Sequence, residues 1–121
     1  MQKTKEQVLI QYKYALAFYK LLTENKAKAS ENKEKGIDNL LLAESIGDLS
    51  SSSGLRKATI SYVLSGLSDV KATTIDKLLE ALGKSYAEFA FYIDNFSDSE
   101  VLDYKKSKEK ERANRAKKVR K

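Results

Sequence analysis

The sequence contains no histidine and no cysteine. The absence of cysteine excludes disulfides, thiolate metal sites and cysteine nucleophiles, and the absence of histidine excludes imidazole acid–base chemistry. The chain also lacks a glycine-rich loop of the kind that holds phosphates in nucleotide-binding enzymes. Carboxylates such as Asp69, Asp76, Glu80 and Glu88 are therefore expected to be helix caps and surface charges. We expect no catalytic residue, no metal site, no cofactor and no enzymatic activity.

Long apolar runs are absent as well. Even runs such as residues 14–19 and 40–43 are far too short to cross a bilayer, and the N-terminus shows no signal-peptide pattern. A chain of 121 residues with 41% apolar content can bury one modest core and leaves some extra length. These features predict a cytoplasmic protein without membrane association.

Positive charge is concentrated at one end of the chain. The net charge is +6, and residues 105–121 contain ten Lys/Arg and two Glu, a net +8. Residues 1–104 therefore carry 6 − 8 = −2. An excess of Lys and Arg over Asp and Glu is only weak support for nucleic-acid binding, because solvated tails also produce such an excess.

The first part of the chain predicts one long helix. Over residues 4–25, apolar residues recur at three- and four-residue spacing, namely Val8, Tyr12, Ala15, Leu16, Tyr19 and Leu22. This helix is expected mainly to cover the core, with some surplus apolar surface for a dimer or a protein partner. Residues 26–36 are charged and predict either a helix extension or a loop. Residues 37–44 predict a short helix or a strand.

The most informative stretch is residues 45–66. Ser45 is a suitable helix N-cap, and Gly54 can adopt the positive φ that ends a first helix. A shared apolar seam is predicted from Leu49, Leu55, Ile60 and Val63, and Ser50 is small enough for two helices to approach closely. This spacing is typical of a helix-turn-helix, although an ordinary helical hairpin has similar spacing. Lys57, Ala58, Ser61 and Tyr62 are expected to face outward from the second helix.

Three further helix starts are marked by capping residues. Either Thr73 or Thr74 can cap a helix that ends at Gly83. Ser85 and Glu88 form a capping box ahead of a helix expected to turn Tyr86, Phe89, Ala90 and Ile93 inward, and Ser97 and Glu100 form another. We therefore expect a domain over residues 1–96, followed over 97–121 by a charged helical extension with a mobile basic tail.

Residues 45–93 resemble the phage-repressor (Cro and XRE) helix-turn-helix family. The resemblance lies in GLRKATISYVLSG at residues 54–66 and TTIDKLLEALGKSYAEF at residues 73–89. It implies an all-α fold, a compact bundle of about five helices of the lambda-repressor type. Relative to that family, residues 27–44 look like an insertion. The chain differs at Ile46, where many relatives carry glutamine, and at Arg56, where a serine or threonine cap is usual.

The resemblance also implies which residues bind DNA. A helix over residues 57–64 would enter the major groove, with Lys57, Ala58, Ser61 and Tyr62 as candidates for base contacts. The candidates for phosphate contacts are Ser45, Arg56, Thr59, Ser65, Ser68 and Lys71.

These observations predict sequence-specific binding to double-stranded DNA by a repressor-like transcriptional regulator. We expect a homodimer, because one short helix reads few base pairs, and association with the nucleoid when DNA is bound. Two alternatives remain. One is an antitoxin-type regulator of a toxin–antitoxin pair, with a protein partner on the N-terminal helix. The other is a protein-interaction module that kept the fold without reading DNA.

Overall fold

The computed structural model describes residues 4–36 and 43–119. Within these ranges there are helices and no strands: α1 (Lys5–Glu34), α2 (Ile46–Ser53), α3 (Lys57–Leu64), α4 (Ala72–Leu82), α5 (Tyr86–Asn95) and α6 (Asp98–Val119). The predicted all-α class is confirmed, with six helices among the described residues where about five were predicted. The additional helix is α6, because the charged extension continues as one helix through Val119.

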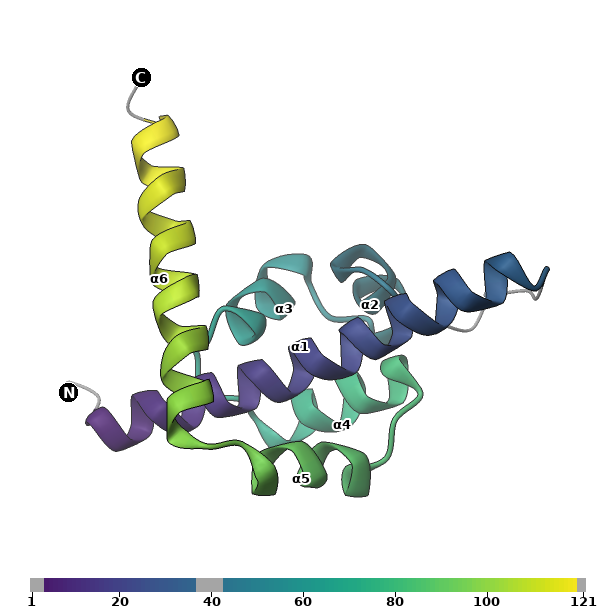
Figure 1. Ribbon diagram of the computed structural model, residues 1–121, viewed down its shortest axis with the longest axis horizontal. Helices are drawn as coiled ribbons and strands as arrows, with labels where there is room; N and C mark the ends of the chain where they lie inside the picture. The colour runs from purple at the N-terminus through teal and green to yellow at the C-terminus, as the bar shows by residue number, and fades with distance from the viewer. Residues whose placement is uncertain (1–3, 37–42, 120–121) are drawn as a thin grey trace.

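The helices are arranged around α1. In Figure 1, α1 runs through the middle of the molecule, with α2 and α3 along one side and α4 and α5 along the other. α6 crosses α1 near its N-terminal end at a steep angle and extends well past α3 (Figure 1). The last helix therefore projects on the same side of the molecule as α2 and α3.

The main core lies between α1 and the four short helices. Phe18 and Leu21 of α1 are almost completely buried, and they share one apolar cluster with Leu78 and Leu79 of α4 and Phe89 of α5. The predicted seam belongs to the same cluster and is confirmed, with Leu49, Ile60 and Val63 buried and Leu55 partly buried.

A smaller cluster joins α1 to α6. Tyr12 and Leu16 pack there against Val101, which is 1% exposed. α6 is thus attached to the body through its first turns. The segment after Lys105 was predicted to be a mobile tail, and its described part lies within α6. Arg112 still contacts the body, so fixed contacts extend further along this segment than the prediction allowed.

α1 is longer than its apolar pattern indicated. It begins at a capping box between Thr4 and Gln7 and continues to Glu34, so the helical alternative is correct over residues 26–34, and residues 35–36 form a turn. The predicted short helix or strand over 37–44 falls mostly on residues 37–42, which lie outside the described residues.

Most of the predicted helix ends are confirmed. The Ser45 hydroxyl accepts a hydrogen bond from the Asp48 amide at 3.1 Å, and Gly54 ends α2 with φ 76°. Gly83 ends α4 in the same left-handed conformation. Both predicted capping boxes form, Ser85 with Glu88 and Ser97 with Glu100.

The predicted start of α4 was wrong. Neither Thr73 nor Thr74 is the cap, because α4 begins at Ala72 and its N-cap is Lys71, whose side chain makes no capping bond. Val70 and Ile75 flank this start, and both pack against the main core. Apolar residues just before and just after a first turn fix the entry of a chain into a helix, so burial rather than a hydroxyl sets this boundary.

The orientation of α5 was predicted only in part. Phe89 is buried and Ile93 is partly buried, as expected, whereas Tyr86 and Ala90 are exposed. The Tyr86 hydroxyl donates to Asp76 on α4 at 2.9 Å, and this hydrogen bond raises the pKa of Tyr86 above its usual value. Tyr86 is the first residue of α5, and it links α5 to α4 at the surface instead of entering the core.

A buried asparagine connects three parts of the chain. Asn25 of α1 is 2% exposed, and its Nδ2 donates to the carbonyls of Ala43 and Leu82 at 2.9 and 3.0 Å. Ala43 lies just before α2, and Leu82 is the last residue of α4. One amide group therefore satisfies two buried backbone acceptors that are far apart in sequence.

We expect Asn25→Ala to lower the free energy of unfolding by about 2–3 kcal/mol, because both carbonyls would lose their donor in the interior. Urea unfolding followed by circular dichroism measures the loss. Asn32→Ala is the matched control, because Asn32 lies on the same helix and makes no hydrogen bond to the described residues. Equal stability of the two variants would contradict a structural role for Asn25.

Candidate nucleic-acid interface

α2 and α3 form a closely packed pair. Three residues, 54–56, connect them, and the Ser50 hydroxyl donates to the Leu55 carbonyl at 2.7 Å. A larger side chain at position 50 would separate the helix end from the turn. The predicted requirement for a small residue here is therefore explained by a direct hydrogen bond as well as by space.

α3 is anchored on one side and open on the other. Ile60, Val63 and Leu64 are buried, whereas Lys57 and Ala58 are exposed and Tyr62 is 56% exposed. We call Lys57, Ala58 and Tyr62 the outer face of α3. An exposed tyrosine on the same helix as an exposed small residue and an exposed lysine leaves this face open to a partner.

Exposed cations lie at the starts of both α3 and α4. Arg56 is the N-cap of α3 and Lys71 the N-cap of α4, and neither side chain makes a capping bond. Arg56, Lys57 and Lys71 are exposed and form no ion pair with any residue of the described ranges. Unpaired cations at helix starts, where backbone amides are also unpaired, favour the approach of an anion.

The loop between α3 and α4 is held against α1. Gly66 has φ 72°, and a Cβ on it would lie 2.4 Å from the Tyr12 ring, so only glycine fits there. Three residues later, Asp69 accepts a hydrogen bond from Gln11 of α1 at 2.7 Å. The backbone around Ser68, a predicted phosphate contact, is therefore fixed on both sides of that residue.

The C-terminal end of α3 is capped by α6. The Tyr104 hydroxyl donates to the Leu64 carbonyl at 2.5 Å, and Arg112 donates to the Ser65 carbonyl at 3.3 Å and to the Tyr12 hydroxyl at 2.7 Å. Helix ends leave carbonyls without intrahelical partners, and here a distant helix supplies the donors. Sequence reasoning missed this connection.

Burial raises the pKa of Tyr104 well above its usual value of 10.0, with smaller contributions from Tyr19, Glu111 and Tyr12. The hydroxyl therefore stays protonated and remains a donor at neutral pH. Since the pKa is raised in the folded state, the stabilisation is complete below pH 10 and is lost as the pH rises further.

The predicted contact residues fall on two separate surfaces. Lys57, Ala58 and Tyr62 form the outer face, and Arg56 and Lys71 are exposed at the N-caps of α3 and α4. Ser45, Ser61 and Ser65 instead line a groove of about 310 Å³ that α6 closes on one side, which we call the α3–α6 groove. Ser61 is thus half-buried, so it was wrong to expect it on the outward side with Lys57. Thr59 and Ser68 are also half-buried.

Three further cations line this groove and were missed. They are Lys26 of α1 and Lys108 and Arg115 of α6. A signal for two of them was present, because Lys105, Lys108, Arg112 and Arg115 recur at three- and four-residue spacing. That periodicity predicts one face of a helix rather than a uniform tail. Nothing in the sequence links this face to Lys26.

Comparison with known proteins found no match among family models, curated proteins or solved structures. The resemblance to the Cro and XRE family therefore depends on residues 54–66 and 73–89. Among the described residues, no helix is long and apolar enough to span a membrane. The same residues contain no group of three or more potential metal ligands among His, Cys, Asp and Glu.

We expect Tyr104→Phe to lower the free energy of unfolding by about 1–2 kcal/mol, because the Leu64 carbonyl loses a partly buried donor while the ring is retained. Thermal unfolding measures the effect. Tyr14→Phe is the control, since Tyr14 is also half-buried and its hydroxyl makes no hydrogen bond to the described residues. A Tyr104→Phe variant as stable as that control would show that the cap contributes nothing.

Proposed function

We propose that this protein binds double-stranded DNA in a sequence-specific way and acts as a repressor-like transcriptional regulator. The observation that carries the proposal is the outer face of α3. Its exposed Lys57, Ala58 and Tyr62 lie opposite a buried anchor of Ile60, Val63 and Leu64. An α-helix fits the major groove, provided that one side is free of protein.

The α2–α3 pair supports a helix-turn-helix for this purpose. Its short connection, the left-handed Gly54 and the buried seam are the features that the motif needs. In such a pair the second helix enters the groove with its N-terminal residues at base edges. Here those residues are Lys57 and Ala58, and Tyr62 follows one turn later.

The proposed contacts follow from side-chain chemistry. Lys57 donates to guanine O6 and N7, and Ala58 offers a methyl contact to thymine. Tyr62 reaches a base or a phosphate. Arg56 and Lys71 are unpaired among the described residues and neutralise phosphates, which adds affinity without sequence information.

A homodimer is part of the proposal, because α3 has eight residues and one such helix reads few base pairs. A two-fold dimer would place two copies of α3 in successive major grooves of a symmetric site.

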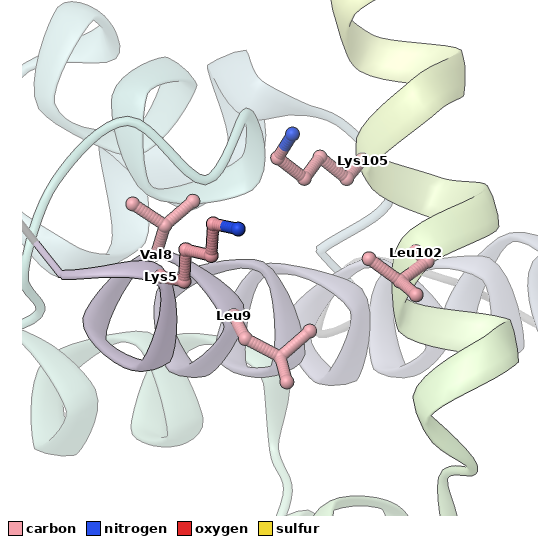
Figure 2. Close-up of a pocket in the computed structure, with 5 residues that line it drawn as sticks. All are labelled: Lys5, Val8, Leu9, Leu102 and Lys105. Atoms are coloured by element: carbon pink, nitrogen blue, oxygen red, sulfur yellow. The ribbon is translucent and has the colours of Figure 1, made fainter.

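A second candidate function is favoured by an apolar groove between α1 and α6. The groove has a volume of about 400 Å³, and Val8, Leu9 and Leu102 line it together with Lys5 and Lys105 (Figure 2). If two copies of the chain met at this groove through a two-fold axis, Lys5 and Lys105 of one copy would face the same two lysines of the other. An apolar segment with carboxylates from a different protein fits better. Such a partner suits the antitoxin-type regulator or an interaction module.

We expect Lys57→Glu to weaken binding to a duplex selected from a random pool by about 10- to 100-fold, because a donor to the bases becomes a carboxylate facing the DNA. Fluorescence anisotropy measures the affinity. Lys77→Glu is the matched control, since Lys77 is exposed on α4 and is unpaired in the described part of the chain. Unchanged affinity of a folded Lys57→Glu variant would refute recognition by α3.

Replacing the cations of residues 117–121 with glutamine separates recognition by α3 from binding by the basic tail alone. This change leaves Tyr104 and Arg112 in place, whereas deletion from residue 105 would also remove Arg112 and its contacts with α1 and α3. On the proposed function the preferred sequence is unchanged, whereas the affinity and its salt dependence both fall. Complete loss of binding would mean that the tail, and not α3, holds the DNA.

A further inference from the structure

The α3–α6 groove is lined by side chains from four helices and a helix cap. Lys26 comes from α1, Ile46 from α2, Ser61 from α3, and Lys108 and Arg115 from α6, while Ser45 is the N-cap of α2. None of these cations belongs to the outer face of α3. The groove is therefore a second, separate collection of polar groups beside the same helix.

The groove carries a positive charge. Its three cations, Lys26, Lys108 and Arg115, face one lining carboxylate, that of Glu111, so its net charge is 3 − 1 = +2. Glu111 pairs with Lys108 at 3.3 Å. Lys26 and Arg115 have no partner among the described residues, so two cations remain available to a ligand.

Lys108 is held in place before any ligand arrives. Its ammonium lies 5.2 Å from the centre of the Tyr104 ring and 5.8 Å from that of Tyr19. Its side chain is only 18% exposed. Aromatic faces attract a cation, and a positioned cation loses less conformational entropy on binding than a free one.

The serine hydroxyls add neutral donors. The Ser45 oxygen accepts from the Asp48 amide, so its own hydrogen remains free to donate. Ser61 and Ser65 line the same groove, and the bond from Arg112 to the Ser65 carbonyl keeps α6 close to them. The spacing between the cations of α6 and the hydroxyls of α3 is thereby fixed by the fold.

We propose that the α3–α6 groove binds a phosphate group. Cations and hydroxyl donors that line one groove from different helices suit a tetrahedral oxyanion with acceptors on all sides, and arginine pairs with phosphate through two parallel hydrogen bonds. If the phosphate belongs to a DNA backbone, this inference rests on the proposed function, and the groove fixes the strand beside α3. The other source of the same chemistry is a small phosphorylated compound.

Two measurements on the full-length protein test the proposal. The first is the affinity for a selected duplex as a function of salt, for Lys26→Ala and Arg115→Ala. Their matched controls are Lys28→Ala on α1 and Lys106→Ala on α6, because both lysines are exposed, unpaired in the described ranges and outside the groove. The second is a titration with inorganic phosphate, followed by the amide NMR signals of Ser45, Ser61 and Ser65 and compared with chloride at equal ionic strength.

For a backbone phosphate, we expect each groove variant to weaken duplex binding about tenfold and to lower the salt slope by about one, with little change in the controls. A small phosphorylated compound would be supported by two results together. The variants would bind the duplex unchanged, and inorganic phosphate would cause saturable shifts of the groove amide signals that Lys26→Ala and Arg115→Ala abolish.

The proposal is overturned if the groove variants behave like their controls and phosphate shifts no groove signal more than chloride does. It is also overturned if Lys28→Ala and Lys106→Ala weaken binding as much as the groove variants, because the effect would then be general charge. A protein that binds no duplex but shows saturable phosphate shifts at the groove would refute the proposed function and leave this inference standing.

Discussion

Two hydrogen bonds from α6 to the end of α3 are the constraint on which both candidate surfaces depend. Tyr104 donates to the Leu64 carbonyl, and Arg112 donates to the Ser65 carbonyl. Arg112 also donates to the Tyr12 hydroxyl of α1. Carbonyls at a helix end need donors, and water would supply them if α6 were absent. Because α6 supplies them instead, the position of α3 is tied to the angle at which α6 crosses α1.

The same connection joins the basic segment to the body. Figure 1 shows α6 continuing past α3, so its cations are carried on a helix of fixed direction as far as the contacts reach. A basic tail attracts DNA in any orientation, whereas a docked helix presents its charges in one register. Arg112 is used for the structure itself, and Arg115, one turn further, lines the α3–α6 groove. One helix face therefore carries both a cation that is bonded within the protein and a cation that lines the groove.

α3 presents two surfaces with different chemistry. The outer face, with Lys57, Ala58 and Tyr62, is open and carries only one charge, which suits the discrimination of base edges. The groove beside it is lined by Lys26, Lys108 and Arg115 together with serine hydroxyls, which suits an anion. Protein–DNA complexes separate positioning from readout in this way, with phosphates held apart from the bases that are read.

The sequence alone determined the local features. Gly54, the Ser85 capping box and the apolar seam from Leu49 to Val63 were predicted, because each depends on residues within a few positions of one another. The start of α4 and the exposure of Ser61 were not, since neighbours in space decided them. Only the tertiary structure brought Lys26 together with Arg115, and Tyr104 together with α3. Periodicity shows which side of a helix is buried, but the helix that covers it is chosen by packing.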